Sequence, residues 1–417
     1  MELKGRDFRL LLGSALAVAV LVRLALLLYP VDPFANPDSL SFQAIAKTLV
    51  DGGRLGYVDR GIPGFELRAF RSILYPILLA LGIVTRTGTA GVLVIQALLG
   101  VAVVAAVAGI GRRLYGNTTG LVAAWFGALY WTPVLWERQI MSEALFTPLL
   151  VFGVLFSVEA MTKERGRRLR ALGGGLLFGL ATLVRPAGIL AAAVVAAVAF
   201  LGAGDGGPLL SPGSWRKRLV VPAIVLGGLA VVTGPLVIRN AALLGRPVIL
   251  TSGGHNFWIG NRVGTRAEAW AIMAERLPSM GEVGMDRWFY EDLRARGPEL
   301  ARSAPSLLAS KLKITLDPVS RNPVNQPYRW LLPLALAGFL LSRPRHRPAD
   351  WLVKLVPLSQ IALAVVSLPG QRYRSPADPF LWLLAAAAAT VLWRDGRRGR
   401  TVLVLYALLQ GALLALL

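Results

Sequence analysis

The chain has 417 residues, of which 55% are hydrophobic and 16% charged, and its mean hydropathy is +0.58. This composition excludes an ordinary soluble domain, which would carry more charge and fewer apolar residues. The formal net charge of +22 does not indicate a nucleic-acid partner, because Lys and Arg fall mainly in short clusters between apolar stretches. The absence of cysteine excludes disulfides, thiolate chemistry and cysteine-based metal sites.

Apolar stretches of about 17–25 residues recur along the chain, the length that crosses a bilayer. The first, 10–29, is too long for a signal-peptide core, so we expect a retained helix. Clusters of basic residues separate the stretches, and if all face the cytoplasm an even number of crossings lies between neighbours. These clusters are Lys4/Arg6/Arg9, Arg112/Arg113, 163–170, 216–218, Arg343/Arg345/Arg347 and Arg394/Arg397/Arg398/Arg400.

The apolar segment 72–84 is the exception to a simple count of crossings. At about 13 residues it is too short to span comfortably. Counting it as a crossing would also place Arg112 and Arg113 outside the cell. We therefore predict a re-entrant or outer-leaflet segment that closes a first outer loop, 30–87.

The remaining apolar runs agree with an even number of crossings between neighbouring basic clusters. The predicted crossings are 10–29, 88–111, 118–136, 143–162, two within 171–204 that turn near Arg185 and Pro186, 219–240, 328–342, 350–368, 376–393 and 401–417. The chain is thus predicted to be an all-α polytopic membrane protein with about eleven crossings, its N-terminus in the cytoplasm, and a single domain over 1–417.

A second large outer loop is predicted at 241–327. Apolar and charged residues mix at helical spacing in 286–297 and 300–316, which predicts two amphipathic helices on the membrane surface. Trp288, Phe289 and Tyr290 are interpreted as interfacial anchors. Because the large loops lie outside, where no nucleotide is available, an enzyme built on them needs a lipid-linked or self-activated substrate.

Two acidic positions at the outer edge are candidates for chemistry. Asp38 precedes an amphipathic helix predicted at 41–50, and its position alone favours a helix N-cap. Glu143 falls where a helix resumes after Glu137 and Arg138. A carboxylate at the membrane edge is costly and often functional, but a solvated loop charge is an equal alternative there.

Several arginines break the positive-inside pattern. They are Arg185, Arg239, which with Asn240 is predicted to end a helix, and Arg372 and Arg374 on either side of Tyr373. Lipid-headgroup anchoring explains any one of them. The set favours a phosphate ligand, which guanidinium binds through paired hydrogen bonds.

His255 is one of only two histidines, and we expect it to make a loop hydrogen bond. No HExxH or paired-histidine spacing occurs, so the sequence supports no metal site and no certain cofactor.

Several segments occur in one order along nearly the whole chain: Asp38 with Phe42 and Ala46, 70–76, 112–116, Arg138 with Glu143, 179–186, Arg239/Asn240 with Gly260/Asn261, and 372–376 with Pro379. Together they resemble membrane glycosyltransferases of the GT-C class. The resemblance is to the bacterial branch related to the aminoarabinose transferase of lipid A, to protein O-mannosyltransferases and to dolichyl-phosphate-mannose-type enzymes. Ser39 follows Asp38 where several relatives have a second acid, which weakens a paired-carboxylate or metal site.

The resemblance implies a sugar donor linked to polyprenyl phosphate and a lipid, glycan or protein acceptor at the outer face of a bacterial cytoplasmic membrane. It implies Asp38 as the catalytic base of a single inverting displacement. Phosphate or acceptor ligands would be Arg71, Arg185, Arg239 and Arg372, and Glu143 would hold the acceptor or a positive partner. Tyr75, Asn240, His255 and Tyr373 complete the candidate substrate-binding residues.

Other functions remain open at this stage. A flippase or transporter of lipid-linked glycans also needs cationic groups among helices, although it would more often place charges deep within several spans and show an internal repeat. A ligase or polymerase that uses pyrophosphate-linked glycans is a close neighbour. A non-catalytic scaffold would not need arginines opposite a carboxylate.

Overall fold

The computed structural model describes residues 4–28, 31–202, 214–261, 264–317 and 326–415. The last positions of the predicted spans 10–29, 171–204 and 401–417, and parts of the predicted loops 30–87 and 241–327, lie outside the described residues. Within these ranges the chain is helical except for its loops and a two-stranded antiparallel ribbon, β1 (Tyr57–Val58) with β2 (Glu66–Leu67). The predicted all-α class is confirmed.

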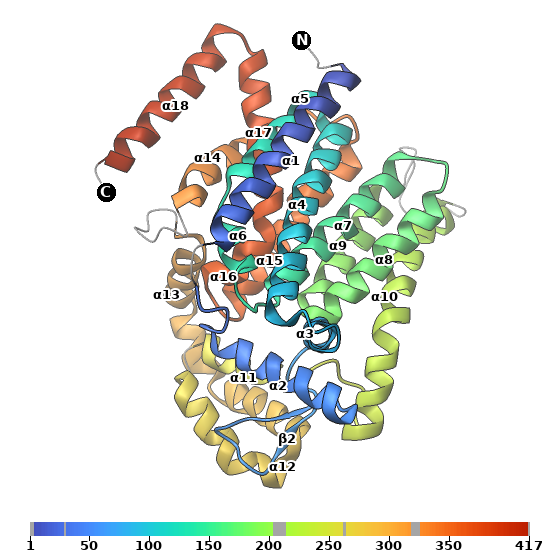
Figure 1. The fold of residues 1–417 in the computed structure, drawn as a ribbon, viewed down its shortest axis with the longest axis vertical. Helices are drawn as coiled ribbons and strands as arrows, with labels where there is room; N and C mark the ends of the chain where they lie inside the picture. The colour runs from blue at the N-terminus through green and yellow to red at the C-terminus, as the bar shows by residue number, and fades with distance from the viewer. Residues whose placement is uncertain (1–3, 29–30, 203–213, 262–263, 318–325, 416–417) are drawn as a thin grey trace.

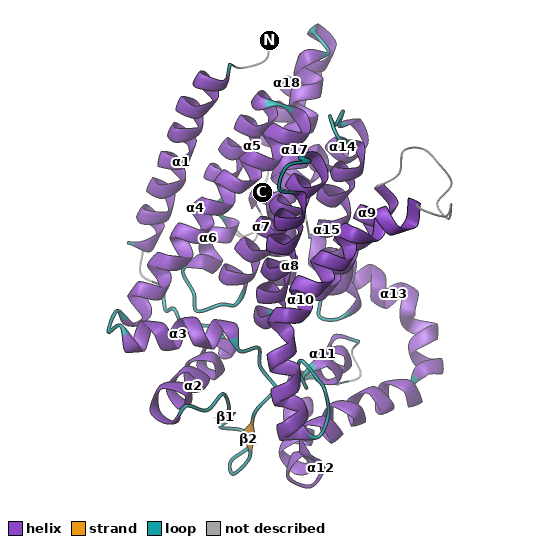
Figure 2. Ribbon diagram, turned by 90° about the vertical axis from the view of Figure 1, so that its right-hand side faces the viewer, coloured by secondary structure: helices purple, strands orange, loops and turns teal. Residues whose placement is uncertain are grey.

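Most helices run side by side in one bundle (Figures 1 and 2). They are α1 (Gly5–Leu27), α4 (Gly88–Tyr115), α5 (Asn117–Leu129), α7 (Glu143–Thr162), α8 (Arg167–Val184), α9 (Ala187–Gly202), α10 (Ser214–Leu244), α14 (Gln326–Leu341), α15 (Arg347–Val366) and α17 (Asp378–Arg394). The last helix, α18 (Arg397–Ala415), packs against α17 and diverges from the bundle in Figure 1.

A second body, here called the head, covers the end of the bundle farther from the N-terminus (Figure 1). The head consists of α2 (Pro37–Gly52), the β1–β2 ribbon, α3 (Leu74–Val84), α11 (Gly253–Gly260), α12 (Arg266–Ala295) and α13 (Gly297–Leu316). Short elements join the two bodies: α6 (Thr132–Glu137), α16 (Gln371–Arg374) and the 3-10 turn η2 (Ser375–Ala377).

Six helical segments among the described residues are long and apolar enough to cross a membrane: Gly5–Leu27, Gly88–Tyr115, Glu143–Thr162, Arg216–Leu244, Arg347–Val366 and Gln371–Arg394. Shorter apolar helices include Ala187–Gly202 and Pro327–Leu341. The chain is therefore a multi-pass membrane protein, while the count of eleven crossings stays a prediction. Helix α3 lies across the end of the bundle (Figure 2), in agreement with a segment that does not cross.

Two predicted helices have different limits in the structure. The helix expected over 118–136 is interrupted after Leu129, because Tyr130 is extended and a new helix, α6, begins at Thr132 with Pro133 in its first turn. The predicted helix end at Arg239 and Asn240 is wrong. Helix α10 continues to Leu244 and stops at Gly245, whose φ of 70° is the left-handed conformation that glycine adopts readily.

The two predicted outer loops share one hydrophobic core. Its buried members are Ile45, Tyr57, Ile62, Leu67 and Phe70 from the first loop, and Trp258, Ala269, Met273, Leu277, Met285 and Phe289 from the second. The predicted helices at 286–297 and 300–316 form as parts of α12 and α13. Phe289 is not an interfacial anchor, because it is only 1% exposed within this core, whereas Tyr290 is 44% exposed.

Buried polar contacts fix the head to the bundle. The Nζ of Lys311 in α13 donates to Asn261 Oδ1 at 3.1 Å and to the carbonyls of Val366 and Ser367, at the end of α15, at 2.9 and 3.1 Å. Within the head, Glu282 of α12 accepts the backbone N–H of Ala69 at 3.0 Å. The head is thus held by specific bonds as well as by apolar packing.

Gly260 provides a test of this junction. A Cβ at this last residue of α11 would lie 1.8 Å from the carbonyl oxygen of Ser367. We expect Gly260→Ala to lower stability by about 1–3 kcal/mol, the usual cost of overpacking. Thermal unfolding of the purified protein in nanodiscs measures the loss. Gly297→Ala is the matched control, because no atom lies within 4 Å of its added Cβ. Equal melting temperatures of the two variants would contradict the close packing of α11 on α15.

Candidate active site

A cavity of about 670 Å³ opens where the head meets the bundle, a size typical of small-molecule sites. Its walls come from α2, the segment after β1, the chain before α3, the α8–α9 turn, α11, α12 and α16. Six residues proposed from the sequence line it: Asp38, Arg71, Arg185, His255, Arg372 and Tyr373. Further lining residues that are charged are Lys47, Asp59, Arg60 and Arg266.

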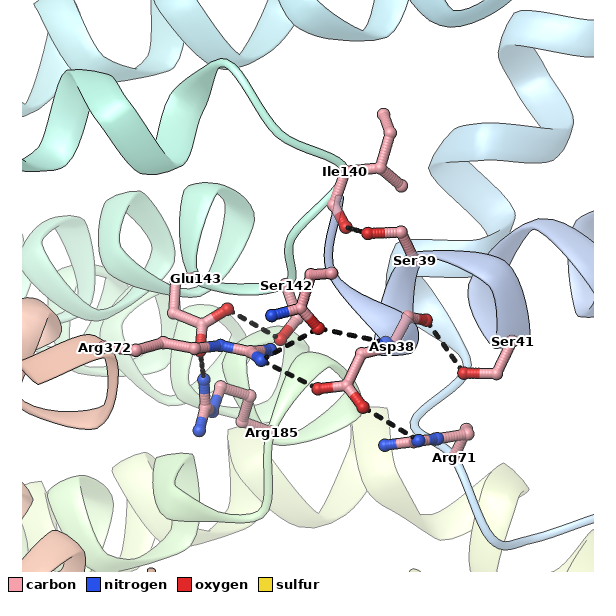
Figure 3. Close-up of polar contacts among 10 residues, drawn as sticks. Asp38, Ser39, Ser41, Arg71, Ile140, Ser142, Glu143, Arg185 and Arg372 are labelled. Carbon is pink, nitrogen blue, oxygen red and sulfur yellow. Dashed lines mark hydrogen bonds and ion pairs between the residues drawn. The ribbon is translucent and has the colours of Figure 1, made fainter. Parts of the chain in front are cut away.

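Asp38 does not cap α2, so the interpretation from position alone is wrong. The N-cap is Asn36, whose side-chain oxygen accepts the Asp38 N–H at 3.0 Å. The carboxylate of Asp38 is therefore free to face the cavity. It lies between two guanidinium groups, with Arg71 Nη2 2.9 Å from Oδ1 and Arg372 Nη1 2.8 Å from Oδ2 (Figure 3).

The charge state of Asp38 follows from these neighbours. Burial alone would raise the pKa of this carboxyl, but Arg71 and Arg372 outweigh burial and hold the pKa well below its usual range. Asp38 is therefore ionised at neutral pH. Because the folded-state pKa is lowered, its ion pairs stabilise the fold above about pH 4, and this contribution is lost only as the pH falls below the unfolded-state value.

Ser39 occupies the position where several relatives have a second acid. Its hydroxyl is fully buried and donates to the carbonyl oxygen of Ile140 at 2.8 Å (Figure 3). A carboxylate at this position would face a carbonyl acceptor without a proton to donate. Ser39 instead joins the start of α2 to the segment that leads into α7.

Glu143 is the second carboxylate of the site. It is the first residue of α7 and is 2% exposed, so it is a buried charge rather than a solvated loop charge. Its Oε1 accepts from Arg185 and, at 2.5 Å, from Arg372 Nε (Figure 3). Glu143 does not line the main cavity, so it acts on any ligand there through the arginines that it orients.

The arrangement carries an excess of positive charge. Three guanidinium groups, Arg71, Arg185 and Arg372, face two carboxylates, Asp38 and Glu143. These arginines are anchored by ion pairs, and all three line the cavity. The site is therefore suited to a phosphate or another anion.

Arg372 lies between two openings. Besides the main cavity it lines a more open cavity of about 640 Å³ on the side of α6 and α13. The other residues of this second cavity are Trp136, Ser310, Lys313, Ile314, Asp317, Gly370 and Gln371. Two ligands could thus reach the same guanidinium group from different sides.

His255 lies on α11, not in a loop, and is 5% exposed. Its Nδ1 is 3.4 Å from Asn256 Oδ1, and its Nε2 has no hydrogen-bond partner among the described residues. The rings of Phe70, Trp270 and Phe289 surround the imidazole with centroids 5.4–5.6 Å away. Burial lowers the pKa of His255 to about 4, so the imidazole is neutral at physiological pH.

Three residues proposed from the sequence lie elsewhere. Tyr75 is fully buried and donates to Gln96 Oε1 at 2.5 Å. Arg239 donates to the backbone carbonyl of Leu55 at 2.7 Å, and Asn240 donates to that of Val248 at 2.8 Å. The structure does not bring these side chains to the cavity. Tyr75 and Arg239 join the head to the bundle instead, and Asn240 holds the chain that follows α10.

Arg23 is a charged residue that the sequence analysis missed. It is 2% exposed in α1, and its Nε and Nη2 donate to Glu137 at 2.7 and 2.9 Å. A lone arginine within the apolar run 10–29 was enough to predict a buried ion pair, because charges inside a span nearly always have partners. This pair fixes α6, close to the segment that carries Glu143.

Trp270 and Tyr57 were missed as lining residues of the cavity, and no signal in the sequence could have found them. They come from different outer loops, and only the shared core of the head decides which rings reach the cavity. Within the described ranges no group of three or more His, Asp or Glu side chains is placed to hold a metal ion.

Comparisons with known proteins agree with this architecture. Residues 72–235 match the family model described as dolichyl-phosphate-mannose-protein mannosyltransferase. This region contains Glu143 and Arg185 but not Asp38 or Arg372. No curated protein sequence matches the chain significantly.

Several solved structures are similar in fold, and two of them are complexes with a lipid phosphate. The archaeal oligosaccharyltransferase AglB from Archaeoglobus fulgidus, in complex with an inhibitory peptide and a dolichol-phosphate, has a TM-score of 0.59 at 15% identity and covers 96% of this chain. ArnT from Cupriavidus metallidurans bound to undecaprenyl phosphate has a TM-score of 0.51 at 15% identity and covers 93%. The chain spans 52% of AglB and 61% of ArnT. The resemblance to GT-C class glycosyltransferases and the GT-C type of fold are thereby confirmed.

Proposed function

We propose that this membrane protein transfers a sugar from a polyprenyl-phosphate-linked donor to an acceptor at the outer face of a bacterial cytoplasmic membrane. The observation that carries the proposal is a buried aspartate held between two arginines, Arg71 and Arg372, in a cavity where the head meets the membrane-spanning bundle. The GT-C type of fold and the lipid phosphates bound to AglB and ArnT support it.

The reaction follows from the placement of charges. Arg185 and Arg372 lie on the bundle side of the cavity and would bind the lipid phosphate, with Arg71 next to them. Asp38 would take the proton of the acceptor hydroxyl while the oxygen of that hydroxyl bonds to the anomeric carbon. The bond from that carbon to the phosphate oxygen breaks, and the electron pair leaves with the polyprenyl phosphate. One such displacement inverts the anomeric centre.

Donor binding would also switch Asp38 into a better base. With both arginines on its carboxylate, Asp38 has a lowered pKa and accepts protons poorly. A bound phosphate would compete for the hydrogen bonds of Arg71 and Arg372, because each guanidinium has a fixed number of N–H donors. The pKa of Asp38 would then rise when the donor is in place and proton transfer is needed.

The orientation in the membrane rests on the basic residues at the far end of the bundle. Arg113, Lys163 and Arg170 all pair with Glu159 there. The N-terminus lies at the same end, opposite the head (Figure 1). By the positive-inside rule this end faces the cytoplasm, and the head faces outward.

The test is a reconstituted assay. The protein in nanodiscs is given undecaprenyl phosphate linked to glucose, mannose, galactose or arabinose, with a cell-envelope extract as the source of acceptor. We expect these donors to yield free undecaprenyl phosphate at different rates, quantified by mass spectrometry. A flippase would instead move a donor between the leaflets of a proteoliposome and leave its sugar–phosphate bond intact. That outcome for all four donors would exclude sugar transfer from them.

A further inference from the structure

The two ends of the main cavity differ in chemistry. On the bundle side the arginines Arg185 and Arg372 lie among uncharged residues, which are Val184, Pro186, Leu368 and Tyr373. On the head side an aromatic compartment, defined here as Phe70, His255 and Trp270, forms the wall. Asp38 and Arg71 lie between the two ends. The guanidinium carbon of Arg71 is 5.6 Å from the centroid of the Phe70 ring. A ligand with its phosphate at the arginines would place its next group against the aromatic compartment.

The aromatic compartment contains one polar atom without a partner. His255 Nε2 is buried and bonded to no described residue. A buried polar group that is left unbonded costs free energy, so native proteins rarely keep one without a ligand, a water molecule or a function. The ring contacts of Phe70 and Trp270 fix the orientation of the imidazole and thereby the position of Nε2.

The charge of His255 limits the kind of ligand it can bind. Burial, together with the nearby Arg71 and Arg266, keeps the imidazole neutral. A neutral imidazole is a poor ligand for phosphate but can donate to or accept from a hydroxyl group. Aromatic walls with a few fixed polar groups are the usual composition of sites for partly apolar ligands, and a sugar ring presents C–H faces and hydroxyl edges.

We propose that the aromatic compartment binds the transferred sugar and that His255 Nε2 forms a hydrogen bond with one of its hydroxyl groups. His255 is then a specificity-determining residue, which selects the donor by the position or orientation of that hydroxyl. The inference rests on the proposed function, because it assigns the sugar of the polyprenyl-phosphate donor to this end of the cavity.

The test compares His255→Phe, which keeps the ring but loses both nitrogens, with His255→Gln, which keeps a side chain able to donate and accept. Tyr290→Phe is the matched control, because it removes one hydroxyl from the head at a position outside the cavity. The probes are undecaprenyl phosphate alone and the two donors that the unchanged protein consumes fastest. Thermal unfolding is measured for every variant.

We expect His255→Phe to bind undecaprenyl phosphate within twofold of the unchanged protein and to raise KM for the preferred donor about tenfold, the effect of one lost hydrogen bond. The preference between the two donors should fall by a similar factor, and His255→Gln should recover part of it. If His255→Phe unfolds, Trp270→Leu tests the same compartment and should raise KM for the donor but not weaken binding of undecaprenyl phosphate.

Three results would overturn the inference. A KM change for the acceptor alone would assign the compartment to an acceptor sugar, and an equal loss of undecaprenyl phosphate binding would assign it to the carrier. Unchanged kinetics in His255→Phe and His255→Gln would leave the histidine a structural role only. In each case the unchanged protein still transfers sugar, which distinguishes failure of the inference from failure of the proposed function.

Discussion

Asp38→Asn is expected to lower the rate of sugar transfer by about 10²- to 10⁴-fold, the usual contribution of a general base, without weakening the binding of undecaprenyl phosphate. The amide has the size of the carboxylate but cannot take the proton of the acceptor hydroxyl. It also competes less with phosphate for Arg71 and Arg372, because it has no charge and only one acceptor oxygen, so undecaprenyl phosphate should bind at least as tightly as before. A loss of turnover without a loss of carrier binding is the signature of a base.

The measurement needs both readouts on one preparation. Turnover is followed as release of undecaprenyl phosphate in nanodiscs, and carrier binding is followed by the shift in melting temperature. Asp51→Asn is the matched control, because Asp51 lies on the same helix and is exposed. Full transfer by Asp38→Asn would refute the base assignment. A parallel loss of carrier binding would show that Asp38 organises the arginines instead.

Arg372→Lys is expected to lower turnover by about 10²- to 10³-fold, comparable to the loss of one hydrogen-bond donor to a developing oxyanion. The guanidinium of Arg372 uses Nη1 for Asp38 and Nε for Glu143 at the same time. An ammonium group is a single point charge on a flexible stem and does not reproduce this planar bridge. The variant keeps the positive charge, so the loss would report geometry rather than net charge.

Stability should respond less than activity in Arg372→Lys, because Glu143 retains Arg185 and Asp38 retains Arg71. Melting temperature and turnover are therefore measured together. Arg54→Lys, in the first predicted outer loop with a side chain 70% exposed, is the control and should behave like the unchanged protein. Turnover within threefold of the unchanged protein would show that the lysine suffices and that the bridge between Asp38 and Glu143 is not needed.

The membrane architecture is predictable from the sequence because it depends on two long-range physical constraints. Apolar length predicts which segments can span, and charge parity predicts that 72–84 does not, in agreement with helix α3 lying across the end of the bundle (Figure 2). The limits of the helices are less predictable where one residue controls them. Gly245 ends α10 five residues beyond Asn240, and Tyr130 interrupts a run that contains no charged residue.

The site is predictable only in part, for a physical reason. Glu143, Arg185 and Arg372 are recognisable as candidates because charge at the edge of a span usually has a partner. Asp38 is indicated by the resemblance alone, since its position favours a helix cap. Which partner each one takes depends on the packing of helices that are far apart in the sequence. Arg239 breaks the positive-inside pattern as Arg372 does, yet it donates to the backbone carbonyl of Leu55 rather than to a carboxylate.

The shared core of the head has a consequence for protein engineering. Rings and aliphatic side chains from 45–70 interlock with those from 258–289, so each predicted outer loop forms half of a single interface. A chimera that takes one of these loops from a homologue would place two unmatched surfaces against each other. Exchanging both loops together would preserve their interface and would transfer the substrate selectivity of the homologue's head to the chimera.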